Sequence, residues 1–327
     1  MLFVDNQEVN DPRQNLALEE FLLRHVRITE PLLLFYINEP SVIIGRNQNT
    51  LEEIDPFYVR ANDIHLVRRL SGGGAVYHDL GNLNFSFITQ GREDLHNFAR
   101  FTDPVIRVLR ELGVDAELRG RSDIFVDGRK ISGNAQYASR GRMFSHGTLL
   151  FDSDIAQMLK AINPRQLKIE SKAVQSVRSF VSNIRELLPE DMTIVELKQA
   201  ILASTFGRNK IPTYELSDGD KDRIRQISED RYGTWDWNVG RSPRFNVQKS
   251  ERFPVGKVDA RIDVDHGYIR SIKIYGDFTG KLEIAELETQ LIGVRYDADV
   301  LAEAMRGLDI QHYIGGLSQE QFLELLY

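Results

Sequence analysis

The segment Arg68–Asn84 reads Arg-Arg-Leu-Ser-Gly-Gly-Gly-Ala-Val-Tyr-His-Asp-Leu-Gly-Asn-Leu-Asn and gathers more chemically functional residues than any other stretch of the chain. Three consecutive glycines follow Ser71, so the backbone there can adopt positive φ and a ligand can lie directly against its amides. Residues 65–70 and 82–87 alternate in character, which predicts a strand on each side of the glycines. We therefore predict a strand, a glycine loop and a strand that bind an anionic or a long, narrow ligand. A glycine-rich hairpin turn without a ligand is the competing interpretation.

A second polar segment lies further along the chain. Alternate residues from position 130 to position 136 are polar, which predicts a strand whose polar face is too polar for a core and too regular for a loop. Residues 143–151 are predicted to form the next strand, with His146 and Thr148 on one face. The members of the predicted polar face are Lys130, Ser132, Asn134 and Gln136.

Taken together, these segments resemble the lipoate-protein ligase family. Four motifs occur in the order and spacing of that family: Arg69–Asp79 (Arg-Leu-Ser-Gly-Gly-Gly-Ala-Val-Tyr-His-Asp), Gly81–Asn84 (Gly-Asn-Leu-Asn), Lys130–Ala135 (Lys-Ile-Ser-Gly-Asn-Ala) and His146–Leu150 (His-Gly-Thr-Leu-Leu). The resemblance extends from the N-terminus to the last predicted helix. It implies an α+β fold: a mixed-sheet catalytic domain of the biotin/lipoate ligase type, which is like the class II synthetases, followed by a smaller α+β C-terminal accessory domain.

The length of 327 residues exceeds what one hydrophobic core usually organises, so two domains are expected. The composition changes at residues 235–243, where glycine and proline interrupt regular structure. After this break, residues 258–264 and 269–275 alternate and predict a two-stranded hairpin. Helices are expected at 281–290, 298–306 and 318–326. We predict a catalytic domain at residues 1–245 and an accessory domain at residues 246–327.

The elements of the predicted catalytic domain follow from local patterns. Apolar residues at helical spacing predict helices at 15–26, 56–62, 98–112, 154–161, 194–205 and 220–230. Short apolar runs predict strands at 2–4, 32–37 and 42–44. The pair Asp127-Gly128 is a strong turn signal, so residues 122–126 should pair with residues 129–137 in a hairpin.

Composition and charge exclude several classes of protein. The formal net charge of −7 argues against a general nucleic-acid binder. No segment reaches the roughly 18 apolar residues of a transmembrane helix and the N-terminus lacks the pattern of a signal peptide, so no membrane association is expected. The absence of cysteine excludes disulfides, thiolate zinc sites and cysteine nucleophiles, and with them the octanoyl or lipoyl transferases of this fold that use a cysteine nucleophile. A reducing cytoplasm is the expected location.

The resemblance implies an ATP-dependent enzyme that joins lipoate to a lysine of an acceptor protein. Free lipoate is first activated to lipoyl-AMP with release of pyrophosphate, because direct amide formation from a carboxylic acid is unfavourable in water. The lipoate carboxylate and the α-phosphate repel each other by on the order of 5 kcal/mol at about 3 Å and an effective dielectric of about 20. Lys130 is the candidate catalytic cation between them, and it can then polarise the acyl carbonyl when the acceptor lysine attacks. An exposed strand lysine is the competing interpretation.

Other charged residues near these motifs also have predicted roles. Arg69 is expected to pair with ATP phosphates or with the leaving pyrophosphate. The hairpin places Asp123 beside Lys130, and the resemblance assigns it to the adenylate, where it would hold Mg²⁺ through a phosphate. A solvated carboxylate or a plain partner for Lys130 is the alternative. His78 and His146 lack the spacing of a metal site, so hydrogen-bonded structural roles are predicted.

The irregular segment at residues 167–184 is serine-rich, basic and without a period. The resemblance implies a loop that folds over the adenylate; a solvated basic linker is the alternative. The residues to which the resemblance assigns binding of substrate or lipoyl-AMP are Arg69, Ser71, Gly72, Gly73, Gly74, Ala75, Val76, Tyr77, Asn82, Asn84, Asp123, Lys130, Ser132, Gly133, Asn134, Ala135, His146, Gly147, Lys168, Ser176, Val177 and Arg178.

The implied small molecules are ATP, Mg²⁺ and lipoate or octanoate. The implied protein partners are the lipoyl-acceptor domains of 2-oxoacid dehydrogenase E2 subunits and the glycine cleavage H protein. Two other functions stay open: a lipoyltransferase that uses only preformed lipoyl-AMP, and a non-catalytic lipoate-binding protein. A biotin ligase is disfavoured because residues 119–121 match its arginine–glycine loop only in part. The residue pattern does not distinguish lipoate from octanoate, or one acceptor protein from another.

Overall fold

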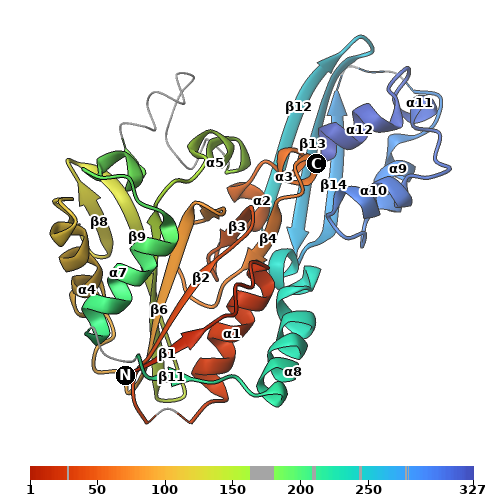
Figure 1. Cartoon of the computed structure of the whole chain (residues 1–327). Helices are drawn as coiled ribbons and strands as arrows, with labels where there is room; N and C mark the ends of the chain where they lie inside the picture. The colour runs from red at the N-terminus through yellow and green to blue at the C-terminus, as the bar shows by residue number, and fades with distance from the viewer. Residues whose placement is uncertain (28, 163–179, 208–210, 243–244, 277, 279) are drawn as a thin grey trace. The chain divides into compact units, whose positions relative to one another are not determined.

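The computed structural model describes residues 1–27, 29–162, 180–207, 211–242, 245–276, 278 and 280–327. The described residues form two compact units, Met1–Asn238 and Val239–Tyr327 (Figure 1). The predicted boundary between residues 245 and 246 would instead separate the first residue of strand β12 (Phe245–Phe253) from the rest of that strand. The division into domains at 1–245 and 246–327 stays a prediction.

The first unit is built on an eight-stranded mixed sheet with the strand order β11-β1-β2-β6-β10-β9-β8-β7. Strand β1 is parallel to β2 and β11, and the other neighbours are antiparallel. The strands are β1 (Leu2–Asp5), β2 (Leu32–Ile37), β6 (Asn82–Gln90), β7 (Glu117–Arg119), β8 (Asp123–Val126), β9 (Arg129–Ser139), β10 (Arg142–Leu150) and β11 (Thr213–Tyr214). A smaller sheet, β4-β3-β5, contains β3 (Ser41–Ile44), β4 (His65–Arg68) and β5 (Val76–His78).

The predicted helices of the first unit are confirmed to within about a turn at each end. The helices are α1 (Pro12–Arg24), α2 (Thr50–Glu53), α3 (Pro56–Ala61), α4 (Phe98–Glu111), α5 (Ile155–Ala161), α7 (Ile194–Phe206) and α8 (Asp218–Ile227), with short 3₁₀ or π turns at Arg185–Leu187, Ser228–Tyr232 and Asp236–Gly240. Helix α1 begins earlier than predicted because Pro12 occupies its first position and the Asp11 carboxylate accepts a hydrogen bond from the Arg13 amide (2.8 Å).

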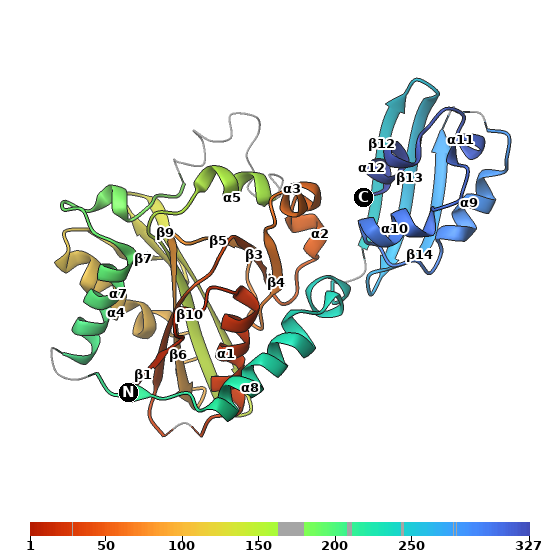
Figure 2. The same ribbon diagram turned by 45° about the vertical axis from the view of Figure 1, so that its right-hand side comes forward.

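Each face of the main sheet is covered by a pair of helices (Figure 2). Helices α4 and α7 cover one face, where Phe85 of β6 belongs to the same apolar core as Val105 and Leu197. Helices α1 and α8 cover the other face, where the core contains Leu34 of β2 and Phe144 of β10. Because alternate residues of a strand point to opposite faces, Asn82, Asn84 and Ser86 of β6 point to the face that α1 covers.

A β-bulge at Ile131 changes the predicted faces of strand β9. Strands β8 and β9 pair Asp123 with Gly133 and Phe125 with Lys130, so β9 holds one more residue than β8 between these two pairs. The extra residue interrupts the alternation of side chains. Lys130 therefore shares a face with Gly133: a Cβ built on Gly133 would lie 3.1 Å from Lys130 Nζ. The predicted single polar face is wrong, and the residues that lie on the opposite face from Lys130 are Ser132, Asn134 and Gln136.

The second unit contains a three-stranded antiparallel sheet, β12-β13-β14, and a set of helices. The predicted hairpin is confirmed as β13 (Gly256–Asp265) and β14 (Tyr268–Gly276), and its turn residues His266 and Gly267 both have positive φ. Strand β12 is an addition to the prediction. The helices are α9 (Ile284–Leu291), α10 (Ala298–Ala304), α11 (Ile310–Tyr313) and α12 (Gln319–Leu326). Among the described residues of the whole chain, no helix has the length and apolar character needed to cross a membrane.

Candidate active site

A cavity of about 310 Å³ lies on the face of the main sheet that α1 covers. Its floor contains a row of residues from neighbouring strands, because the register places Asn84 of β6 between Tyr36 of β2 and Thr148 of β10. The Thr148 hydroxyl in turn accepts a hydrogen bond from the Gly133 amide of β9 (3.2 Å). Residues 73–76, from the glycine loop and the start of β5, line the same cavity. The cavity is therefore enclosed between the main sheet and the predicted glycine loop.

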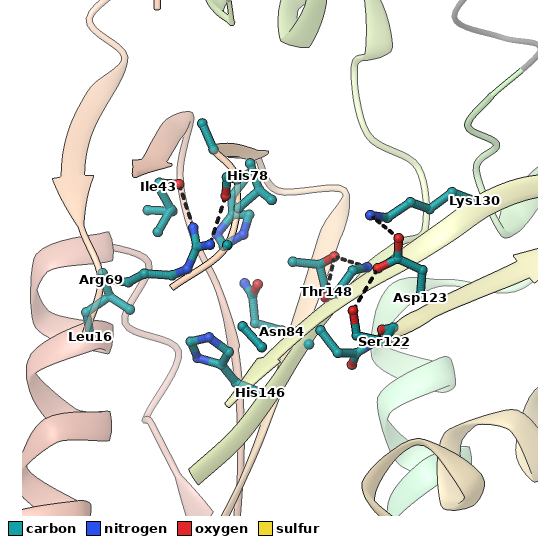
Figure 3. A pocket seen from close by; sticks show the side chains of 18 of the residues that line it. Leu16, Ile43, Arg69, His78, Asn84, Ser122, Asp123, Lys130, His146 and Thr148 are labelled. Atoms are coloured by element: carbon teal, nitrogen blue, oxygen red, sulfur yellow. Dashed lines mark hydrogen bonds and ion pairs between the residues drawn. The ribbon is translucent and has the colours of Figure 1, made fainter. Parts of the chain in front are cut away.

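Lys130 and Asp123 form a charged end of this cavity. Lys130 Nζ is 2.8 Å from Asp123 Oδ2, and about a third of each side chain is exposed (35% and 33%). The predicted position of Asp123 beside Lys130 is thus confirmed. Figure 3 shows this pair on one side of the cavity and Arg69, His78 and Ile43 on the other. A ligand that lies along the cavity would meet a lysine ammonium at one end.

The chemistry of this end fits a magnesium ion that arrives with a nucleotide. Mg²⁺ prefers oxygen ligands and usually binds through one or two carboxylates together with phosphates and water. Asp123 supplies a partly exposed carboxylate that lines the cavity. No group of three or more His, Asp or Glu side chains that could hold a metal ion occurs among the described residues. The role of Asp123 as a ligand of Mg²⁺ stays a prediction.

The buried guanidinium of Arg69 holds the glycine loop in shape. Its Nε donates to Ser71 Oγ (3.0 Å) and its Nη1 donates to the Ile43 carbonyl (2.9 Å). Its Nη2 donates to the carbonyls of Gly72 (2.7 Å) and Gly74 (2.8 Å). Burial lowers the pKa of Arg69 to about 10, so the guanidinium stays charged at neutral pH. In this structure Arg69 donates to the loop, and its pairing with phosphates stays a prediction.

His146 connects the cavity to helix α1 and to the glycine loop. Its Nδ1 lies 3.0 Å from Glu19 Oε1 and its Nε2 lies 2.8 Å from Ser71 Oγ. Glu19, His146 and Ser71 are connected as in a catalytic triad. Ser71 is not placed to act as a nucleophile, because it is fully buried, does not line the cavity, and its Oγ accepts a hydrogen bond from Arg69 Nε. These hydrogen bonds therefore position the loop. The predicted hydrogen-bonded role of His146 is confirmed, and His146 also lines the cavity.

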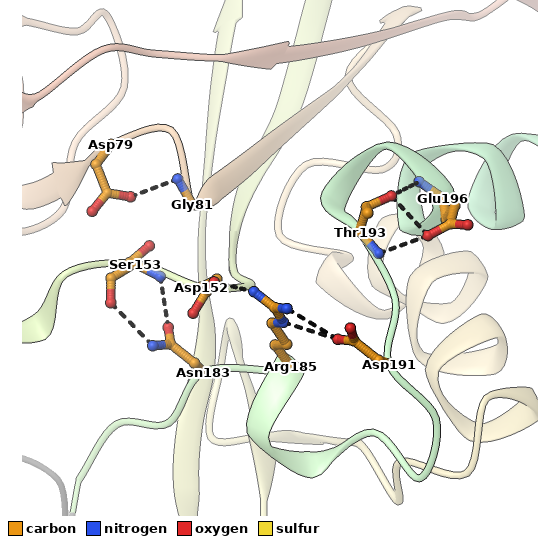
Figure 4. A network of polar contacts seen from close by, with 9 residues as sticks. All are labelled: Asp79, Gly81, Asp152, Ser153, Asn183, Arg185, Asp191, Thr193 and Glu196. Carbon is orange, nitrogen blue, oxygen red and sulfur yellow. Dashed lines mark hydrogen bonds and ion pairs between the residues drawn. The ribbon is translucent and has the colours of Figure 1, made fainter.

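The segment that begins at Phe180 forms hydrogen bonds both with the backbone of Lys130 and with the residues that follow β10. The Lys130 amide donates to the Phe180 carbonyl (2.7 Å), and the Ser182 amide donates to the Lys130 carbonyl (3.1 Å). Asn183 then makes two hydrogen bonds with the backbone of Ser153 (Figure 4): its Oδ1 accepts from the amide (2.9 Å) and its Nδ2 donates to the carbonyl (3.0 Å). Lys130 is thus held by backbone hydrogen bonds to a segment that is itself anchored.

Asp79, which ends the first motif, and Gly81, which begins the second, have structural roles in the same region. Asp79 Oδ1 accepts from the Gly81 amide (2.9 Å) and Oδ2 accepts from the Asp154 amide (2.7 Å). Burial raises the pKa of Asp79. A Cβ at Gly81 would lie 2.0 Å from the Asp152 carbonyl oxygen, so the turn between β5 and β6 requires glycine at this position. Arg185 Nη1 pairs with the Asp152 carboxylate (2.8 Å; Figure 4).

Most of the residues predicted to bind substrate line the cavity: Arg69, Gly73, Gly74, Ala75, Val76, Asn84, Asp123, Lys130, Gly133, Asn134, Ala135, His146 and Gly147. The predicted residues that do not line it are Ser71, Gly72, Tyr77, Asn82 and Ser132. Tyr77 belongs instead to an apolar cluster with Val42 and Ile44, because it points to the other face of β5 from His78. The residues Lys168, Ser176, Val177 and Arg178 lie outside the described residues. The binding roles of all these residues stay predictions.

Several residues of the site come from elements without a motif. The cavity residues that sequence analysis does not identify as binding residues are Leu16, Tyr36, Ile43, His78, Ser122 and Thr148. Sequence analysis also misses Glu19, which contacts His146. The sequence does contain a signal for it, because Asn15 and Glu19 are polar and four residues apart in α1. The structure shows that both are almost fully buried (1% and 2% exposed). Polar residues at i and i+4 on the apolar stripe of a helix indicate a buried polar contact.

The fold and the site define a class of protein. A mixed sheet covered by helices holds a narrow cavity beneath a glycine loop, and a lysine ammonium stands at one end of that cavity. This arrangement fits an enzyme domain whose cavity accepts a slender small molecule with an anionic end.

Comparison with known proteins shows the family. Residues 11–206 match the family model of the Lipoyl protein ligase A/B catalytic domain, and residues 242–326 match that of the Bacterial lipoate protein ligase C-terminus. The chain is 53% identical over 331 residues to lipoate-protein ligase LplJ of Bacillus subtilis and 45% identical over 327 residues to lipoate–protein ligase 1 of Staphylococcus aureus, with 100% of both chains covered in each case. The chain belongs to the lipoate-protein ligase family, as its motifs predict.

Solved structures confirm the predicted fold. A bipartite lipoate protein ligase from Thermoplasma acidophilum, described with its E2 lipoyl domain, has 29% identity and a TM-score of 0.66, covering 75% of this chain and 98% of that one. A protein from the same organism with bound lipoic acid has 29% identity and a TM-score of 0.62 (73% and 98% covered). A lipoate-protein ligase A bound with ATP has 30% identity and a TM-score of 0.60 (73% and 97% covered).

Proposed function

We propose that this chain is an ATP-dependent lipoate–protein ligase. It activates free lipoate to lipoyl-AMP with release of pyrophosphate and then transfers the lipoyl group to a lysine of an acceptor domain. The observation that carries the proposal is the cavity in which the Lys130 ammonium stands at one end of a groove lined by glycine loop residues 73–75. Lipoate-protein ligases related over the whole chain, and structural neighbours with bound lipoic acid and ATP, support it.

In the activation step, an oxygen of the lipoate carboxylate forms a bond to the α-phosphorus of ATP, and the bond to pyrophosphate breaks. Lys130 offsets the repulsion between these two anions. Its ammonium has three donors, of which one is directed to Asp123, so among the described residues two are left for the carboxylate and a phosphate oxygen. Gly133 lets the ammonium lie against the sheet, because a side chain there would meet Lys130 Nζ at 3.1 Å.

In the transfer step, the amine nitrogen of the acceptor lysine forms a bond to the acyl carbon, the bond to AMP breaks, and the proton that the amine loses passes to the leaving phosphate of AMP or to water. The same Lys130 ammonium stabilises the negative charge that develops on the acyl oxygen. Asp123 would hold a Mg²⁺ ion that is bound with the nucleotide, and that ion would supply positive charge at the phosphates. One lysine thus acts in both steps.

The test is lipoate-dependent exchange of labelled pyrophosphate into ATP. Exchange, followed by lipoylation of an acceptor domain, is the expected result. A lipoyltransferase that uses only preformed lipoyl-AMP would transfer the lipoyl group but show no exchange. A non-catalytic lipoate-binding protein would bind lipoate and show neither activity. Either of these outcomes would contradict the proposal.

The proposed acceptors are the lipoyl domains of 2-oxoacid dehydrogenase E2 subunits and the glycine cleavage H protein, and the proposed location is the cytoplasm. One structural neighbour is a ligase described with its E2 lipoyl domain, which supports the first acceptor. Incubation with each purified apo-acceptor, lipoate and Mg-ATP should produce an acceptor heavier by one lipoyl group. An acceptor that stays unmodified under these conditions is not a substrate.

A further inference from the structure

The cavity wall contains a buried hydrogen-bonding atom that no described residue satisfies. His78, the last residue of β5, is 3% exposed and lines the cavity. Its Nδ1 lies 3.0 Å from Asn38 Nδ2. Its Nε2 is buried and has no hydrogen-bond partner in the part of the chain that the structure describes. Buried polar atoms in proteins almost always have a partner, so an exception at a cavity wall points to the ligand.

A series of asparagine side chains determines which ring nitrogen of His78 carries the proton. Asn15 Nδ2 donates to the Val9 carbonyl (2.8 Å), which can only accept, so the orientation of the Asn15 amide is fixed. The same Nδ2 donates to Asn38 Oδ1 (2.9 Å), so Asn38 Nδ2 faces His78 Nδ1 and donates to it. The proton of the neutral ring is therefore on Nε2. Burial, followed by the charge of Arg69, lowers the pKa of His78 to about 3, which keeps the ring neutral at neutral pH.

A second donor lines the same cavity. Tyr36 is 4% exposed and lies on the cavity floor beside Asn84. Burial raises the pKa of the Tyr36 hydroxyl, which therefore stays protonated, and no hydrogen bond of this hydroxyl occurs among the described residues. The charge of Arg69 acts on both Tyr36 and His78. Figure 3 shows His78 beside Arg69, on the other side of the cavity from Lys130.

We propose that His78 and Tyr36 contact the tail of the acyl chain and make the cavity prefer lipoate to octanoate. This inference rests on the proposed function, which places the carboxylate at Lys130 and therefore the tail near the Arg69 side. The lipoate tail ends in a ring with two sulfur atoms, which are polarisable and accept weak hydrogen bonds. The octanoate tail has only methylene and methyl groups, so it would bury both donors without an acceptor. The preference thus arises from a penalty on the wrong ligand.

Binding of the two acids to the full-length protein tests this proposal. His78→Phe and Tyr36→Phe each remove one donor and keep an aromatic ring. By calorimetry, we expect the wild type to bind lipoate about tenfold more tightly than octanoate or better, and each variant to reduce this ratio about fivefold or more. Tyr214→Phe is the matched control, because it removes a hydroxyl from strand β11, outside the cavity, and should leave the ratio unchanged.

The outcomes separate this proposal from the proposed function. Equal affinities of the wild type for the two acids, or an unchanged ratio in both variants, would overturn the role of the two donors. In that case lipoate-dependent pyrophosphate exchange by the wild type would still support the ligase activity. A wild type that binds neither acid would contradict both. If circular dichroism shows that His78→Phe does not fold, Tyr36→Phe decides, since it removes a single hydroxyl that the fold does not use.

Discussion

Among single residues, Lys130 contributes the charge that both half-reactions use in the proposed mechanism. Lys130→Met keeps an apolar stem but removes the ammonium, so we expect lipoyl-AMP formation and lipoyl transfer each to fall about 10²-fold or more. Pyrophosphate exchange measures the first step, and transfer from preformed lipoyl-AMP measures the second. The fold should persist, because the side chain is about a third exposed (35%). Rates within a few-fold of wild type in both steps would show that another group supplies the charge.

Gly73 is the loop residue at which a side chain would interfere with both backbone and ligand. Its φ is +97°, and a Cβ there would lie 2.9 Å from Arg69 Nη2. Gly73→Val should therefore distort the loop and lower lipoate affinity by about tenfold or more in calorimetry. The matched control is Gly141→Val, which also has positive φ (+74°) but no atom within 4 Å of its Cβ position. If both variants bind lipoate as the wild type does, the groove does not hold the ligand.

His78 also makes the stability of the fold depend on pH. Burial lowers its pKa from 6.5 to about 3, so the unfolded chain binds a proton that the folded chain resists. The contribution of this residue is therefore fully present above pH 6.5 and is lost as the pH falls toward 3, at about 1.4 kcal/mol per pH unit. Urea unfolding at pH 7, 6 and 5 should show a smaller loss for His78→Phe than for the wild type. The control is His266→Gln, which changes an exposed ring in a turn. Parallel pH profiles of wild type and His78→Phe would rule this coupling out.

At the scale of elements, local signals explain what the sequence could predict. The helical period of residues 98–112 and the turn at Asp127-Gly128 lie within the segments that they organise, and both predictions are confirmed. The bulge at Ile131 was not predictable in this way, because it depends on how β9 pairs with β8. For the same reason Tyr36 gave no signal of its own: only the sheet register brings it beside Asn84 and into the cavity. Motifs therefore identified the residues of β9 and the loop, and missed those of β2.

The segment after Phe180 should act on catalysis through the position of Lys130. Asn183→Leu removes both hydrogen bonds to Ser153, so we expect a loss of about 1–3 kcal/mol in the free energy of unfolding. Exchange and transfer should both become slower at saturating substrates, because the backbone of Lys130 is bonded to this segment. The control is Asn62→Ala, which removes a side-chain hydrogen bond at an exposed helix end. If the Asn183→Leu protein is destabilised but has normal rates, the contact between Asn183 and Ser153 stabilises the fold and does not affect catalysis.

For the molecule as a whole, the described residues that line the cavity all belong to the first unit, Met1–Asn238. The end of this unit is held by Arg68, whose side chain is fully buried. Its Nε donates to the Trp237 carbonyl (3.0 Å) and its backbone amide donates to Asn238 Oδ1 (2.9 Å). The Trp237 indole N–H in turn donates to the Arg68 carbonyl (2.7 Å). The last residues of the unit therefore complete the hydrogen bonding of a charge in its core.

This arrangement predicts where the chain can be shortened. A fragment of residues 1–242 retains the whole cavity and all these contacts, so it should fold and bind lipoate with an affinity close to that of the full chain. A fragment of residues 1–235 loses Trp237 and Asn238, so the buried Nε–H and the backbone amide of Arg68 lose their acceptors, although Nη1 and Nη2 still donate to the Gln48 carbonyl and to Thr50 Oγ1. The loss of a hydrogen bond from a buried charged group costs about 1.5–3 kcal/mol. Circular dichroism and calorimetry on both fragments provide the comparison. If the fragment of residues 1–235 is as stable as the fragment of residues 1–242, Arg68 does not depend on its contacts with Trp237 and Asn238. If the fragment of residues 1–242 does not fold, the first unit needs the rest of the chain, and the predicted domain division is wrong.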